Sequence, residues 1–126
     1  MFHEIEKVAE FHRSFSVNIS NKPCIPMERK DLRLNLIYEE YCELNQAIDN
    51  NDLVETFDAL LDLQYVLFGT VLEFGLQDYF SAGFDEVHRS NMTKLDSTGS
   101  PKYRKDGKVI KSDMYIKPDL ISILSR

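Results

Sequence analysis

Two pairs of acidic residues, each with its members three positions apart, constrain this chain more than any other feature. Glu40 and Glu43 fall in one segment with helical apolar periodicity, and Glu55 and Asp58 fall in the next. A spacing of three puts both members of a pair on one helix face, about one turn apart. Two such helices packed side by side would aim four carboxylates at one small volume, where like charges resist joint ionisation. Because hard oxygen ligands at this density suit Mg²⁺ or Mn²⁺, the pattern predicts a metal site between helices.

Apolar periodicity predicts four long helices, expected over residues 2–15, 27–48, 53–74 and from about 78 onward. Asp52 is the expected N-cap of the third helix, and Gly75 is its expected C-terminal stop. That helix is apolar on most sides, which predicts that it is the central, buried helix.

Beyond Lys94 the helical pattern ends, and Asp106-Gly107 between two short strand-like runs predicts a hairpin. The remaining residues are expected to lie over the helices. The predicted fold is therefore all-α, a bundle of four to five helices with a short C-terminal β-hairpin. A chain of this length fits a single domain, residues 1–126.

Charge is distributed unevenly along the chain. Residues 1–87 carry 6 basic and 17 acidic side chains, whereas residues 88–126 carry 9 basic and 4 acidic ones. This distribution does not favour binding to a nucleic-acid duplex, but it suits metals on carboxylates with a polyphosphate bridging them to lysines. A basic tail is equally typical of a solvated terminal segment. With no secretory segment and no apolar run of ~20 residues, we expect a cytoplasmic protein without membrane contact.

Three acidic residues, Glu55, Asp58 and Asp62, fall on one stripe of the very apolar third helix. An unpaired buried carboxylate costs several kcal/mol or more, so we interpret the stripe as a site rather than a solvated face. Glu39, four residues before Glu43, is a candidate for the group that takes a proton from an attacking water. Asp62 is the second candidate for that role, or a further ligand. Taken alone, the glutamates of the second helix are more typical of a solvated face.

A di-iron carboxylate bundle is the competing interpretation, and it requires Glu-x-x-His pairs on two helices. The chain contains one comparable pair, Asp85-x-x-His88, which disfavours that interpretation. No glycine-rich phosphate loop is present, so metal ions and cations would have to hold a phosphate. The candidates for phosphate contacts in the last third of the chain are Arg89, Lys94, Lys108 and Lys111. His88 and Asn91 share a helical stripe with Lys94 and are further candidates for substrate binding. Each of them is individually as typical of a solvated side chain.

The acidic pairs together resemble the signature of the MazG-like all-α nucleoside triphosphate pyrophosphohydrolases, E-x-x-E followed by E-x-x-D on consecutive helices. The matching segments are Glu39-Glu40-Tyr-Cys-Glu43-Leu and Glu55-Thr-Phe-Asp58-Ala-Leu. From Val8 to about Leu120 the chain is similar to the phosphoribosyl-ATP pyrophosphohydrolase-like branch. The tail segments that carry this similarity are His88-Arg-Ser-Asn91-Met-Thr-Lys94 and Gly107-Lys108-Val-Ile-Lys111.

This resemblance implies hydrolysis of a nucleoside triphosphate between the α and β phosphates, giving a monophosphate and pyrophosphate. It implies Mg²⁺ or Mn²⁺ held by the four signature acids, with Glu39 in the place of a base proposed in relatives. Asp62 is not part of the general signature. The resemblance also implies a homodimer or homotetramer, which the amount of apolar helix surface favours independently.

We therefore expect a metal-dependent nucleoside triphosphate pyrophosphohydrolase that cleanses nucleotide pools. The alternatives are a phosphoribosyl-ATP pyrophosphohydrolase and a non-catalytic helical oligomer that binds nucleotide or metal. The acidic motif does not choose among these substrates, because it is shared across the family.

Overall fold

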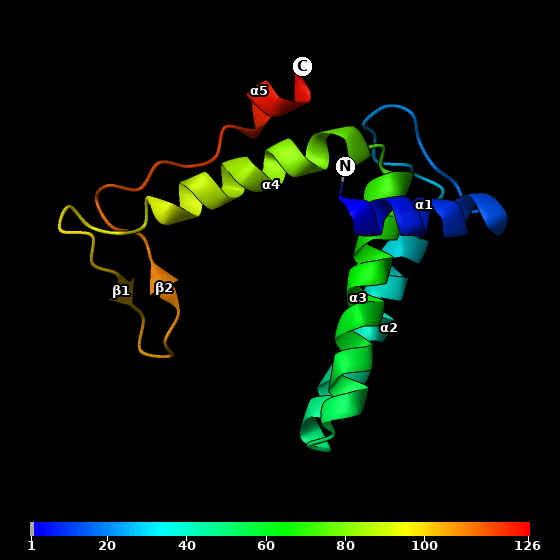
Figure 1. Ribbon diagram of the computed structural model, residues 1–126, viewed down its shortest axis with the longest axis horizontal. Helices are drawn as coiled ribbons and strands as arrows, with labels where there is room; N and C mark the ends of the chain where they lie inside the picture. Colours follow the sequence, from blue (N-terminus) through cyan, green and yellow to red (C-terminus); the bar gives the residue numbers. More distant parts are fainter. Residues whose placement is uncertain (1) are drawn as a thin grey trace. The chain divides into compact units, whose positions relative to one another are not determined.

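The computed structural model describes residues 2–126 and divides them after Asp78 into two compact units. The first unit holds α1 (His3–Ser14), α2 (Lys30–Asp49) and α3 (Leu53–Glu73), as Figure 1 shows. The second holds most of α4 (Gln77–Met92), then β1 (Lys102–Tyr103), β2 (Val109–Ile110) and α5 (Leu120–Leu124). Over the described residues, the predicted all-α bundle with a short C-terminal hairpin is confirmed. The expectation that both units form one domain stays a prediction.

The helices α2 and α3 form an antiparallel pair that lies side by side (Figure 1). The turn between them is short because Asp52 caps α3 as predicted, with its side chain accepting a hydrogen bond from the Glu55 N–H at 3.0 Å. Near this turn, Ala47 of α2 and Ala59 of α3 are both buried. Small side chains let two helix backbones approach closely, so the acidic segments of the two helices face each other.

Helix α1 packs against the C-terminal part of α3. Its buried residues, Ile5, Val8, Ala9 and His12, follow the spacing of a single helix face. At the end of that face the Phe11 ring meets the Tyr65 ring edge-on, with centroids 5.6 Å apart. The first unit therefore has its core at one end of the α2–α3 pair.

The loop after α1 is tied to the C-terminus of α3. The N–H groups of Ser20 and Cys24 donate to the carbonyls of Leu72 and Phe74, at 3.0 and 2.9 Å, which satisfies carbonyls that a helix end leaves unpaired. Gly75 ends the helix as predicted, at φ +70°, and a Cβ there would overlap the Lys22 carbonyl.

Two expectations about the first unit are corrected. Helix α2 begins at Lys30 rather than near residue 27, because the carbonyl of Pro26 first closes a turn with the N–H groups of Arg29 and Lys30. Helix α3 is central, since α1 and α2 both pack on it, but apart from Ala59 its N-terminal half is exposed or half-buried. Leu53 and Phe57 are 81% and 62% exposed, because α1 covers only the other half.

In the second unit, β1 and β2 pair antiparallel, with Tyr103 opposite Val109. The connection is longer than the Asp-Gly pair alone. Arg104 and Gly107 close a turn through the Gly107 N–H at 2.9 Å, and Gly107 follows at φ +91°, a conformation that glycine adopts without strain.

The segment after the hairpin packs along α4, where the Ser90 hydroxyl donates to the Ile116 carbonyl at 2.7 Å. It leads into α5, a short helix that Asp119 caps by accepting from the Ser122 N–H. Among the described helices, none is by itself long and apolar enough to cross a membrane, and only α3 and α4 joined together pass a test of length and composition.

Gly69→Ala is expected to lower the free energy of unfolding by roughly 1–3 kcal/mol, as overpacking does in a filled interior. A Cβ at this position would lie 2.5 Å from Nη2 of Arg33 and 2.9 Å from Nε2 of His12. Gly83→Ala in α4 is the matched control, because a Cβ there meets no atom within 4 Å. The control should be neutral or stabilise the helix by up to about 1 kcal/mol. Urea denaturation followed by circular dichroism measures both, and equal effects would contradict the packing described.

Candidate metal centre

Three carboxylates from two helices converge on the seam between α2 and α3. Glu40, Glu43 and Asp62 each offer one oxygen, and these oxygens lie within 4.8 Å of one another. Glu40 and Asp62 are half-buried, whereas Glu43 is exposed. Oε2 of Glu40 is buried and has no hydrogen-bond partner among residues 2–126. A set of hard oxygen donors with one unsatisfied member fits a divalent cation such as Mg²⁺ or Mn²⁺.

The proximity of these groups changes their acidity. Burial raises the pKa of Glu40 to about 7, with the negative charge of Glu43 as the second cause. Burial also raises the pKa of Asp62, and the charges of Asp58 and Glu43 act in the same direction. Within the described part of the first unit, the charged groups that act most strongly on Glu40 are acidic, so its protonated form is favoured relative to a free glutamate. A bound divalent ion would replace the protons.

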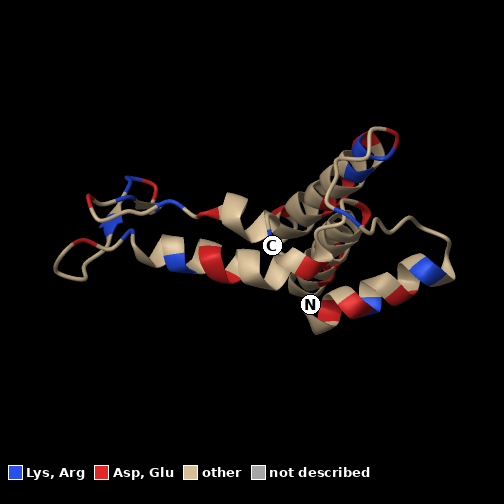
Figure 2. Ribbon diagram, turned by 90° about the horizontal axis from the view of Figure 1, so that it is seen from above, with Lys and Arg blue, Asp and Glu red and all other residues tan. Residues whose placement is uncertain are grey.

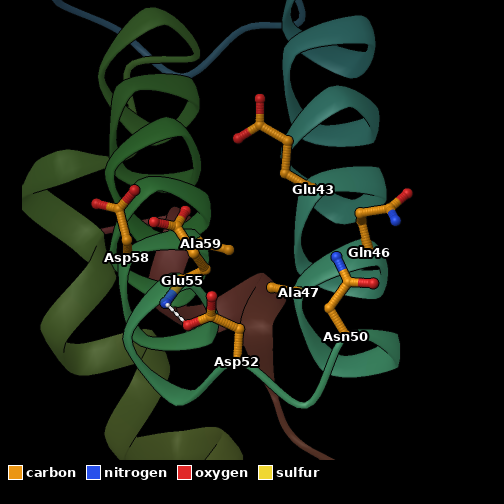
Figure 3. Close-up of a pocket in the computed structure, with 8 residues that line it drawn as sticks. All are labelled: Glu43, Gln46, Ala47, Asn50, Asp52, Glu55, Asp58 and Ala59. Carbon is orange, nitrogen blue, oxygen red and sulfur yellow. Dashed lines mark hydrogen bonds between the residues drawn. The ribbon is translucent and has the colours of Figure 1, made fainter.

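Figure 3 shows the pocket beside this cluster, on the side of the α2–α3 turn. Its volume is about 340 Å³, and Glu43 lines it from α2 while Glu55 and Asp58 line it from α3. The structure thus brings Glu55 and Asp58 to the same pocket as Glu43, although neither belongs to the group of three converging oxygens. The predicted four-acid ligand set stays a prediction. The structure adds Asp62 as an oxygen donor beside Glu40.

A second pocket of about 480 Å³ lies on the other side of the cluster, between α1, α2 and α3. Glu40 and Asp62 line it together with the aromatic rings of Phe11 and Tyr65. Aromatic faces beside a carboxylate cluster would suit a flat heterocycle attached to a metal-bound phosphate.

Arg29 and Arg33 also line this second pocket, as part of an ion-pair cluster that the sequence interpretation missed. It consists of Arg29, Arg33 and Glu73, with Glu73 fully buried. His12 lies beside it, donating through Nδ1 to the Asn18 carbonyl at 3.0 Å, and burial lowers the pKa of its ring. The sequence did contain a signal for this cluster. Glu73 is an acidic residue on a very apolar helix, and the argument that such a residue needs a partner, used above for Asp62, applies to it equally.

The remaining candidates are placed as follows. Glu39 is exposed on α2, next to Glu40. His88 and Asn91 are exposed on α4, and Lys108 is exposed in the hairpin turn. Asn91 and Lys94 line a pocket of about 340 Å³ within the second unit.

The basic residues of the second unit lie mainly in and around the hairpin segment (Figure 2). Among them, Nζ of Lys111 lies 4.5 Å from the centre of the Tyr115 ring, a cation–π contact. The carboxylates belong to the first unit and these lysines to the second. That Lys94, Lys108 and Lys111 contact the phosphates of a substrate bound at the carboxylates therefore stays a prediction.

Comparison with known proteins establishes the family of this chain. The family model for phosphoribosyl-ATP pyrophosphohydrolase matches residues 8–91, which include both acidic pairs and Asp62. The chain belongs to the phosphoribosyl-ATP pyrophosphohydrolase family. Membership confirms the resemblance to the MazG-like all-α superfamily. An uncharacterized protein of Acanthamoeba polyphaga mimivirus is 35% identical over 81 residues, which are 64% of this chain and 29% of that protein. The chain thus matches less than a third of that relative's length.

For this family member, divalent cation binding should strengthen as the pH rises through about 7, the pKa of Glu40. Below that pH a bound ion must displace a proton, which weakens the apparent affinity by up to about tenfold per pH unit. Isothermal titration with Mn²⁺ in buffers of different ionisation enthalpy measures both affinity and proton release. Glu40→Gln should bind more weakly and remove the proton release, and proton release that persists in this variant would contradict the assignment.

The raised pKa of Glu40 also predicts how the stability of the metal-free protein depends on pH. The folded-state pKa of Glu40 lies above its ordinary value of 4.5, so the folded chain holds a proton that the unfolded chain loses between these pH values. The resulting contribution to stability is fully present below about pH 4.5 and is lost as the pH rises through about 7.

Proposed function

We propose that the chain is a metal-dependent nucleotide pyrophosphohydrolase. Its reaction is the hydrolysis of a nucleoside triphosphate between the α and β phosphates, in which one water is consumed and a monophosphate and pyrophosphate are released. Nucleotide-pool cleansing in the cytoplasm is the corresponding cellular role. Family membership over residues 8–91 supports the reaction class.

The observation that carries the proposal is the convergence of three carboxylate oxygens within 4.8 Å, with Oε2 of Glu40 buried and unsatisfied. Three acidic groups without a counter-ion destabilise the helix pair that holds them, which favours a bound cation over a purely structural role. Binding Mg²⁺ there would neutralise the polyphosphate and lower the pKa of an attacking water. The two pockets that flank the cluster leave room for a nucleotide on either side.

The side chains have distinct tasks in this proposal. Glu40 and Glu43 hold the cation from α2, and Glu55 and Asp58 hold it, or a second ion, from α3. Glu39 and Asp62 are the candidates to orient the attacking water and accept its proton. Asp62 lies within the cluster and Glu39 beside it, so only Asp62 has the alternative of acting as a ligand.

Pyrophosphate release from a panel of NTPs and dNTPs, with Mg²⁺, Mn²⁺ or EDTA, tests the proposal. We expect metal-dependent release with a monophosphate as co-product. Glu43→Gln should lower turnover at least about 100-fold, because a ligand of the cation is lost. Its stability should be unchanged or slightly higher, since one source of repulsion is removed. The control is Glu10→Gln, an exposed acid on α1. Full turnover of Glu43→Gln at saturating Mg²⁺ would exclude the assigned site.

The panel also separates the alternatives. Including phosphoribosyl-ATP tests the activity after which the family is named. Preferential hydrolysis of that compound would make it the substrate in place of an ordinary triphosphate. Calorimetric binding of a nucleotide without release of pyrophosphate would instead identify a non-catalytic binding oligomer.

A homodimer or homotetramer is part of the proposal, because the N-terminal half of α3 exposes a large apolar face. Leu53, Val54 and Phe57 are 81%, 74% and 62% exposed, and Tyr38 and Tyr41 of α2 are 65% and 54% exposed. Exposed apolar side chains in this number favour a protein interface.

Phe57→Gln is expected to weaken self-association at least about tenfold, since burying a phenylalanine contributes about 1.5–3 kcal/mol. Met27→Gln is the control, at a side chain 72% exposed in the loop before α2. Light scattering over a concentration series measures both variants. A wild-type mass equal to the 14.7 kDa of one chain at all concentrations would contradict the oligomer.

A further inference from the structure

The ion-pair cluster of Arg29, Arg33 and Glu73 joins α2 to α3. Arg29 donates to the Glu73 carboxylate through Nε at 2.6 Å and Nη2 at 3.1 Å, and Arg33 donates to it through Nη1 at 2.9 Å. Arg33 and Glu73 are 5% and 0% exposed. Hydrogen bonds between buried charged groups are short and directional, so this cluster resists displacement.

Arg33 differs from Arg29 in the number of places where it contacts α3. Its Nη2 donates to the Val66 carbonyl at 2.8 Å and its Nε to the Thr70 hydroxyl at 3.2 Å, in addition to the bond with Glu73. The three acceptors lie on successive turns of one face of α3. A displacement of α2 along α3 by one turn, about 5.4 Å, would break all three bonds.

The carboxylate cluster lies on the same seam. Glu40 follows Arg33 by seven residues, which is two turns or about 10 Å along α2, and Asp62 precedes Val66 by four residues, which is one turn of α3. The register that Arg33 sets is therefore transmitted directly to Glu40 and Asp62. Their oxygens lie within 4.8 Å, so a slip of one turn would separate them.

Arg33 lies on one side of the segment of the α2–α3 seam where acidic side chains repel one another. Repulsion among the acidic groups tends to separate α2 from α3 at Glu40, and it is opposed on both sides. Toward the turn, buried Ala47 and Ala59 pack the helices closely. Toward the other end, Arg33 holds α3, and Gly69 leaves the space for its guanidinium.

We propose that Arg33, anchored on Glu73, is a positioning residue that holds α2 and α3 in the register at which Glu40, Glu43 and Asp62 converge on a divalent cation. The inference rests on the proposed function for the cation, and it adds that cation affinity depends on a group two turns away from the ligands.

Mn²⁺ titration of the free protein, followed by electron paramagnetic resonance, tests this without any nucleotide. Arg33→Lys keeps the charge but loses the three-point contact with α3, and we expect its Mn²⁺ dissociation constant to rise at least about tenfold. Arg29→Lys is the matched control, because Arg29 contacts only Glu73 among these acceptors, and it should change the constant less than about threefold. Ile5→Val controls for lost stability, as it removes a methylene group from a buried residue of α1 that belongs to neither charged cluster.

The outcomes separate positioning from stability alone. Unchanged Mn²⁺ affinity in folded Arg33→Lys would overturn the proposal, and so would an equal loss in Ile5→Val. If Arg33→Lys does not fold, Thr70→Val removes one of the three acceptors. A Mn²⁺ dissociation constant raised beyond that of Arg29→Lys would then support the proposal, and a constant no higher than that of Arg29→Lys would overturn it. Failure of the wild-type protein to bind Mn²⁺ would overturn both the proposed function and this inference. Binding of Mn²⁺ without nucleotide turnover would overturn only the hydrolase, and Arg33→Lys would still decide the positioning role.

Discussion

The neutralisation of Glu73 is the interaction on which the first unit depends. Its carboxylate is fully buried, and leaving such a charge unpaired costs several kcal/mol. The compensating guanidiniums come from Arg33 of α2 and from Arg29, the N-cap residue of that helix, so the requirement selects the face of α2 that packs on α3. His12 of α1 closes the same region as a buried imidazole whose pKa burial lowers. A neutral ring there avoids a further positive charge next to Arg33.

The seam between α2 and α3 therefore carries two charged clusters with opposite properties. In the first cluster, the single carboxylate of Glu73 accepts hydrogen bonds from two guanidinium groups, those of Arg29 and Arg33. Around Glu40, the neighbouring groups are acidic, and the pKa of Glu40 rises to about 7. The first cluster contributes to the architecture, and the second is balanced only by protons or by an added cation. This difference in electrostatic balance, rather than the number of acids, distinguishes the candidate site.

Much of the fold was predictable because its determinants are local. Asp52 caps α3 and Gly75 ends it, as expected from residue type and position alone. The position of the short α5 and the start of α2 at Lys30 were not predicted, because a brief helix and a proline turn leave little periodicity. The exposure of Phe57 was also missed. Apolar periodicity indicates which face of a helix is stabilised by burial. It does not tell whether the surface that covers this face belongs to the same chain.

For the site, the sequence by itself determined the paired acids on consecutive helices and the membership in a pyrophosphohydrolase family. Only the tertiary structure decided that Asp62 joins Glu40 and Glu43, and that Arg33 pairs with Glu73 forty positions away. The physical reason is that helical spacing fixes which residues share a face of one helix. The rotation and axial register of two helices depend instead on contacts between residues far apart in the chain, and these exist only once the helices have packed.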